Sequence, residues 1–142
     1  MFSKSCEYGL RATLFIAQQS LQGNKIGVKT IAEEIGSPEA FTGKILQELT
    51  KNNIVRSIKG PYGGFLIDLK TMKKIKLRDV VKAIDGDKIF KGCALGLKNC
   101  NEKTPCHLHF KFIEIRNEIN AMLGESNLHS IVTDEGNFFL KK

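Results

Sequence analysis

The feature that most constrains the fold is a glycine-rich turn between two short stretches of alternating polar and apolar residues. The turn is Gly60-Pro61-Tyr62-Gly63-Gly64, and the alternating stretches are residues 54–58 and 65–68. Alternation on both sides of such a turn predicts a two-stranded β-hairpin with a tight, glycine-rich tip. The fold must therefore accommodate a hairpin near the middle of the chain.

Three helices are expected before this hairpin. Apolar residues recur at helical spacing over residues 3–20 and 27–36, which predicts one long helix and one short helix. Ser37-Pro38 predicts the start of a third helix, with Ser37 as N-cap and Pro38 at the first helical position. Two short helices joined by a turn and followed by a basic hairpin have the order of a winged helix-turn-helix.

Further helices are expected after the hairpin, at about residues 77–84, 105–123 and 127–132. The long one carries a stripe with spacings of 4, 3, 4 and 3, made by Leu108, Phe112, Ile115, Ile119 and Met122. This is the seam pattern of a coiled coil, and it predicts a homodimer through this helix. Amphipathic packing within one chain would explain the stripe equally well. The last helix and a tail ending Phe138-Phe139-Leu140 are expected on the same interface.

These elements predict a mainly α fold with a small β-hairpin wing. We expect residues 1–85 to form a winged helix-turn-helix DNA-binding region and residues 86–106 a cysteine-rich cluster-binding loop. Residues 105–132 then form the dimerisation helix and the C-terminal helix, and residues 133–142 form a tail.

The charge of the chain favours a polyanionic partner. The 142 residues carry a formal net charge of +7. Residues 1–82 hold 14 Lys and Arg against 7 Asp and Glu, whereas residues 83–142 hold 8 of each. The positive excess thus coincides with the winged region, which favours nucleic acid over a membrane. No long apolar run or signal peptide is recognised, so a cytoplasmic protein is expected.

The second helix of the pair is expected to enter the major groove of double-stranded DNA. Its exposed face offers Glu39, Ala40, Gly43, Lys44 and Gln47. Lysine can hydrogen-bond guanine and glutamine can hydrogen-bond adenine, so Lys44 and Gln47 are the candidate base readers.

The wing is expected to contact phosphates or the minor groove. Its candidate residues are Arg56, Ser57 and Lys59.

Three of the four cysteines, Cys93, Cys100 and Cys106, lie in one loop with six and then five residues between them. Structural zinc sites usually contain closer pairs of the CxxC kind. Three widely spaced thiols fit an iron–sulfur cluster better, with zinc or a disulfide switch as the alternative. We also expect Cys106 in the first turn of a helix that begins at Thr104-Pro105, where the helix dipole favours its thiolate.

A cluster normally takes four ligands, so one position remains open. The candidates are His107, His109, Cys6 and Glu7. The alternative to ligation is an exposed side chain on a helix for each histidine, and a small buried thiol for Cys6. A small iron–sulfur electron carrier is a weaker hypothesis, because electron transfer does not account for the basic helix-turn-helix and wing. Gly43-Lys44 lacks the other residues of a P-loop, and HExxH and GxSxG are absent, so no enzyme is expected.

The wing at residues 56–65, the helix at 37–53, Ala83-Ile84-Asp85-Gly86 and the three loop cysteines together resemble the iron–sulfur winged-helix regulators of the IscR/NsrR type. The resemblance implies a dimeric bacterial transcription factor that binds palindromic promoter DNA. Its cluster, [2Fe–2S] in preference to [4Fe–4S], reports cluster status, redox state or nitrosative stress.

The same resemblance implies which residues bind the cluster. The three cysteines would be ligands, with His109 as the fourth in the cluster-status branch or Glu7 in the nitric-oxide and redox branch. This chain departs from the usual pattern in its first cysteine gap, which is six residues instead of five.

Overall fold

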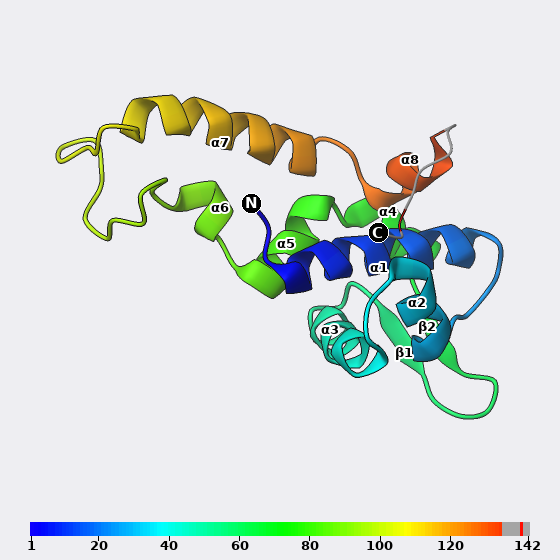
Figure 1. Ribbon diagram of the computed structural model, residues 1–142. Helices are drawn as coiled ribbons and strands as arrows, with labels where there is room; N and C mark the ends of the chain where they lie inside the picture. The colour runs from blue at the N-terminus through cyan, green and yellow to red at the C-terminus, as the bar shows by residue number, and fades with distance from the viewer. Residues whose placement is uncertain (135–139, 141–142) are drawn as a thin grey trace.

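The computed structural model describes residues 1–134 and 140. In that part of the chain, a two-stranded antiparallel hairpin lies at one edge of a group of helices, and the long helix α7 (His109–Gly124) lies at the opposite edge (Figure 1). The elements are α1 (Lys4–Leu21), α2 (Val28–Ile35), α3 (Glu39–Lys51), β1 (Arg56–Ile58), β2 (Gly64–Leu66), α4 (Leu69–Lys74), α5 (Leu77–Asp85), α6 (Lys88–Lys91), α7 (His109–Gly124) and α8 (Leu128–Thr133). The predicted fold class is confirmed.

Helix α1 is the centre of the winged-helix core. It begins after Ser3, whose side-chain oxygen accepts a hydrogen bond from the Cys6 backbone N–H at 3.0 Å, as an N-cap residue does. Ala12 and Ile16, four residues apart on one face, are completely buried. Helices α2, α3, α5 and α8 all pack against α1. One amphipathic helix thus holds the helix-turn-helix elements and the C-terminal elements in a common core.

The turn between α2 and α3 differs from its prediction by one residue. Gly36 ends α2 with φ = 70°, a left-handed conformation that glycine adopts without steric cost. The Ser37 N–H donates to the Ala32 carbonyl at 3.0 Å, so this residue closes α2. Pro38 is the N-cap of α3, and the predicted N-cap role of Ser37 is wrong.

The hairpin pairs Arg56 with Leu66 and Ile58 with Gly64. A Cβ at Gly63 would collide with the Ile58 carbonyl, so only glycine fits this turn without backbone movement. Ile26, just before α2, exchanges backbone hydrogen bonds of 3.1 and 2.8 Å with Phe65. These bonds tie the wing to the rest of the domain.

The C-terminal helix α8 belongs to the winged-helix core of its own chain. Leu128 is completely buried, and its N–H donates to the Ile75 carbonyl at 2.9 Å. Helix α8 packs on α1 and on α4, a short helix that the sequence pattern did not predict. The expectation that α8 lies with the long helix is therefore not met within one chain, and Phe138 and Phe139 lie outside the described residues.

Helix α7 begins at His109, four residues later than predicted. The Thr104 hydroxyl donates to the Asn99 carbonyl at 2.7 Å. Thr104 therefore belongs to a turn within the cysteine loop and does not start the helix. Cys106 also precedes the helix, and its predicted place in the first helical turn is wrong. Figure 1 shows α7 above α5 and α6, on the side opposite α2 and α3, with the cysteine loop projecting past α6.

Candidate nucleic-acid interface and metal centre

Helix α3 presents one buried face and one exposed face. Ile45, Leu46 and Leu49 are buried against the core. The predicted DNA-contacting residues share the other face: Glu39, Ala40, Lys44 and Gln47 are exposed and Gly43 is half-buried. The structure thus places all five predicted reading-helix residues on one accessible side.

The wing residues Arg56, Ser57 and Lys59 are also exposed. The guanidinium of Arg56 forms an ion pair with Asp68 at 3.3 Å, an interaction the sequence pattern did not reveal. Both side chains are about half exposed, 62% and 47%, and such surface pairs contribute only about 0.2–1 kcal/mol. A phosphate could therefore replace Asp68 as the partner of Arg56 at small cost.

Tyr62 at the wing tip was not among the predicted DNA-contacting residues. Its exposed fraction is 88%, the highest of the large hydrophobic side chains in the described residues. The sequence feature that could have identified it is a single aromatic residue inside a glycine-rich turn. An exposed ring at the tip of a wing can pack on sugar or base surfaces.

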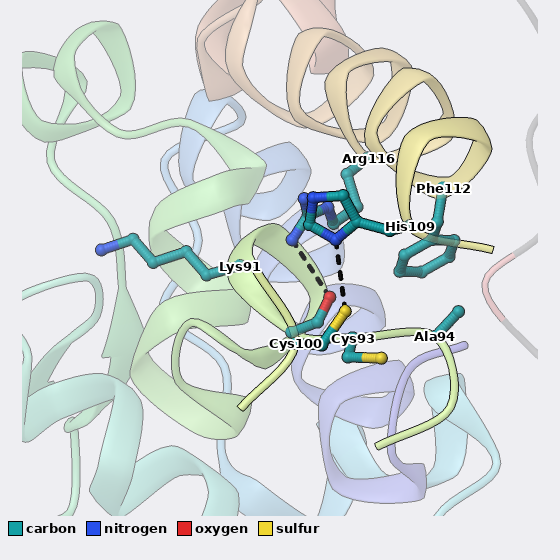
Figure 2. Close-up of a pocket in the computed structure, with 8 residues that line it drawn as sticks. Lys91, Cys93, Ala94, Cys100, His109, Phe112 and Arg116 are labelled. Atoms are coloured by element: carbon teal, nitrogen blue, oxygen red, sulfur yellow. Dashed lines mark hydrogen bonds between the residues drawn. The ribbon is translucent and has the colours of Figure 1, made fainter. Parts of the chain in front are cut away.

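Cys93, Cys100 and Cys106 converge at the beginning of α7. Their three Sγ atoms all lie within 4.8 Å of one another, and the Sγ atoms of Cys93 and Cys106 are 3.7 Å apart. The thiols are half-buried, and two of them line a cavity of about 80 Å³ (Figure 2). Three thiols this close can bind one metal centre together or form a disulfide.

His109 is the fourth group at this site. Its Nδ1 lies 3.2 Å from the Cys100 Sγ, and the imidazole lines the same cavity as the thiols (Figure 2). His107, two residues earlier, is exposed in the turn that precedes α7. The helix start at His109 therefore separates the two histidines and places one of them beside the cysteines.

Glu7 and Cys6 lie elsewhere in the chain. Glu7 is in the first turn of α1 and is not part of the close group of ligand atoms in the described residues. Cys6 is completely buried and packs with Val81 and Leu123. Burial, followed by the nearby Asp85 carboxylate, raises the pKa of the Cys6 thiol to about 12. This thiol is a core side chain within its own subunit.

Hydrogen bonds from the loop backbone distinguish two of the clustered thiols. The backbone N–H groups of Leu97 and then Leu95 lower the pKa of Cys93 to about 7, since hydrogen bonds to a thiolate favour it. The Cys106 backbone N–H lowers the pKa of Cys100, but desolvation and the neighbouring thiols outweigh it and the pKa is raised. Backbone hydrogen bonds thus favour the thiolate of Cys93, whereas desolvation and the neighbouring thiols disfavour the thiolate of Cys100.

Arg116 also lines the cavity, although the sequence analysis did not select it. It follows His109 by seven residues, two helical turns, so the two side chains share one face of α7. This seven-residue spacing from His109 is the sequence feature that could have identified Arg116. Its Nη1 donates to the carbonyl of Gly92 at 3.0 Å, next to Cys93.

The sequence profile of an iron-dependent transcriptional regulator family, Rrf2, matches residues 2–134. The chain belongs to the Rrf2 family. It is 26% identical to the HTH-type transcriptional regulator IscR of Xenorhabdus nematophila, over 90% of this chain and 76% of that protein.

Two solved structures share this fold. CymR (YrzC), the global cysteine regulator of B. subtilis, superposes with a TM-score of 0.76 at 20% identity, over 96% of this chain and 98% of that one. IscR of T. potens superposes with a TM-score of 0.71 at 22% identity, over 94% of this chain and 87% of that one. These similarities confirm the predicted winged-helix architecture.

Membership in the Rrf2 family identifies the protein as a transcriptional regulator. Its relatives are regulators and not enzymes, which confirms the prediction that the chain has no catalytic function. The three clustered cysteines of this chain are compatible with a cluster or with a thiol switch. None of the helices in residues 1–134 is both long enough and apolar enough to cross a membrane.

Proposed function

We propose that this Rrf2 protein is a homodimeric regulator whose binding to palindromic promoter DNA is controlled by an iron–sulfur cluster. The observation that supports it most is the gathering of Cys93, Cys100, Cys106 and His109 at one end of α7. Three thiol sulfurs within 4.8 Å of one another and one imidazole nitrogen fit the donor set of a cluster. We favour [2Fe–2S] over [4Fe–4S], and His109 over Glu7 as the fourth ligand.

When bound, the cluster supplies redox chemistry and sensitivity to small molecules such as oxygen and nitric oxide. The protein residues hold it in a loop whose ends are α6 and α7. Occupancy of the site would therefore restrain residues 92–108 against the start of α7, and loss of occupancy would release them.

The exposed face of α7 is the proposed dimer contact. Three large hydrophobic side chains of the predicted stripe remain exposed on this face: Leu108 (43%), Ile115 (52%) and Met122 (59%). An apolar stripe of this size on one helix is typical of an interaction surface. His109 and Arg116 lie on the same helix, so a change at the cysteines would reach the dimer contact through a few helical turns.

The dimer geometry in turn would set the spacing of the two α3 helices. Helix α7 packs on α5, where the Arg78 Nη1 donates to the Asn120 side chain at 3.1 Å. Helix α5 packs on α1 and α3. Because two half-sites must be about 34–36 Å apart, a small rotation of one subunit is enough to abolish specific binding. The cysteine loop itself projects away from α3, so control would be exerted through these helices.

A disulfide switch is the second candidate function. The 3.7 Å separation of the Cys93 and Cys106 Sγ atoms requires only a small movement to reach the ~2.05 Å of a disulfide bond. Oxidation by hydrogen peroxide would remove two protons and two electrons from the thiols and yield two waters. The acidic Cys93 thiol would attack the oxidant and Cys106 would displace hydroxide to close the bond.

Anaerobic purification followed by an absorption spectrum and by iron, zinc and acid-labile sulfide assays tests the proposal. A brown protein that contains iron and sulfide, and whose promoter binding changes when the cluster is removed, is the expected result. A colourless protein from a host with active cluster assembly, with free thiols that form a Cys93–Cys106 disulfide under peroxide, would favour the switch instead.

Replacing Lys59 by alanine is expected to weaken binding to all DNA sequences alike. If the Lys59 ammonium neutralises one phosphate, the slope of log K against log salt concentration should become shallower by about 0.9. Affinity measured by fluorescence anisotropy at several salt concentrations gives this slope. An unchanged slope would show that the wing does not contact the DNA backbone through Lys59.

Gln47→Ala is the contrasting variant, because it removes a candidate base reader. We expect a loss of about 1–3 kcal/mol that is confined to one base pair of the operator, together with an unchanged salt slope. The two variants together separate base reading by α3 from phosphate contact by the wing.

A further inference from the structure

Arg116 occupies an unusual position beside the cysteine site. Its Nη1 bonds the carbonyl of Gly92 at 3.0 Å, and its guanidinium carbon lies 5.7 Å from the Phe112 ring centroid. Figure 2 shows it next to His109, on the same side of the cavity. The side chain thus bridges α7 and the arm of the loop that carries Cys93.

The guanidinium of Arg116 has a buried donor, its Nε–H, without a hydrogen-bond partner among the residues that the structure describes. No ion pair involves Arg116 within residues 1–134 and 140, and no carboxylate lines the cavity there. Buried donors in folded proteins are almost always paired, so an unpaired one points to a missing acceptor.

The side-chain acceptors that line this cavity are the Cys93 and Cys100 sulfur atoms and the His109 ring, whose Nε2 is also buried without a hydrogen-bond partner in the described residues. When thiolates and a cluster fill the site, the local charge becomes negative and every sulfur becomes a hydrogen-bond acceptor. Hydrogen bonds to the sulfurs and the net charge around a cluster are two of the factors that set its reduction potential.

We propose that Arg116 is a positioning residue of the cysteine site, which holds the Cys93 arm through Gly92 and directs its Nε–H and its charge towards the sulfur ligands of the cluster. This inference rests on the proposed function. A fixed cation stabilises the reduced cluster, which carries one more negative charge, over the oxidised one. Arg116 therefore raises the reduction potential and sets the redox range to which the regulator responds.

Three variants separate this role from a purely structural one. Arg116→Gln removes the charge, Arg116→Lys keeps the charge but removes the Nε–H, and Lys111→Ala removes an exposed cation of α7 as the control. Iron and sulfide content is measured first, and the midpoint potential of each loaded protein is then determined by redox titration followed in the absorption spectrum. If Arg116→Gln binds too little iron for a redox titration, the midpoint potential of Arg116→Lys decides between the two roles.

Arg116→Gln is expected to shift the reduction equilibrium at least tenfold towards the oxidised cluster, which is about 59 mV for a one-electron couple. Arg116→Lys should lie between it and the wild type, and Lys111→Ala should match the wild type. Lower cluster occupancy with an unchanged potential would overturn the inference, because it would leave Arg116 only a structural clamp. A wild-type protein that binds no iron would overturn the proposed function and this inference together.

Discussion

Alanine at Cys93, Cys100 or Cys106 is expected to reduce bound iron and acid-labile sulfide to background. The three Sγ atoms lie within 4.8 Å of one another, so each thiol contributes to one shared site. Removing one thiolate leaves an iron atom with an open position and a loop that no longer closes around the cluster. Iron, sulfide and absorbance of anaerobically purified variants measure the effect.

The histidines and Glu7 provide the matched comparisons for this experiment. His109→Ala should give a cluster with an altered spectrum and faster loss in air, because its Nδ1 lies beside Cys100. His107→Ala removes an exposed imidazole two residues away and should have no effect. Glu7→Gln tests the alternative fourth ligand. If the spectrum changes only in this variant, the fourth ligand is Glu7 of α1 and not His109. Full cluster content in all three cysteine variants would exclude the proposed site.

Leu46→Ala is expected to lower the free energy of unfolding by about 2–5 kcal/mol. Leu46 is completely buried between α3 and the core, so its removal loses apolar contacts and leaves a cavity. The total stability of a domain is only about 5–15 kcal/mol, which makes this a large fraction of it. Urea denaturation of the iron-free protein measures the change, at one protein concentration because the proposed dimerisation would add to stability.

An exposed leucine serves as the control for this variant. Leu69 is 50% exposed at the start of α4, and Leu69→Ala should change stability by no more than about 0.5 kcal/mol. DNA affinity of Leu46→Ala at low temperature shows whether α3 remains in place once its anchor is gone. Equal stability of the two alanine variants would mean that α3 is not held by the core in the way described.

These experiments act on two parts of the molecule that share few contacts. Helix α3 and the wing lie on one side of α1, whereas the cysteine loop and α7 lie on the other (Figure 1). Helix α5 contacts both α1 and α7. Under the proposed function, a signal from the cysteines would therefore reach DNA through a shift of α5 against α7 or through a change in the proposed contact between two α7 helices. The Arg78–Asn120 hydrogen bond is a contact through which the first route can be tested.

The sequence by itself determined the elements of the winged helix. Helical periodicity and the turn at Gly36 predicted α1, α2 and α3 to within a few residues, and alternation around residues 60–64 predicted the hairpin. Local patterns suffice here because each helix or strand buries a face that is encoded in its own residues. The short helices α4 and α6 escaped prediction, since few apolar residues in their basic segments mark a buried face.

Only the tertiary structure decided the composition of the cysteine site. The sequence left four candidates for the remaining ligand. The helix-start signal at Thr104-Pro105 predicted that α7 begins there. In the folded chain the Thr104 hydroxyl bonds the Asn99 carbonyl, so α7 begins at His109 and directs this imidazole, and Arg116 two turns later, at the cavity. The physical reason is that Cys93 and Cys106, thirteen residues apart, meet only because the loop folds back on α7. Local periodicity carries no information about such a contact.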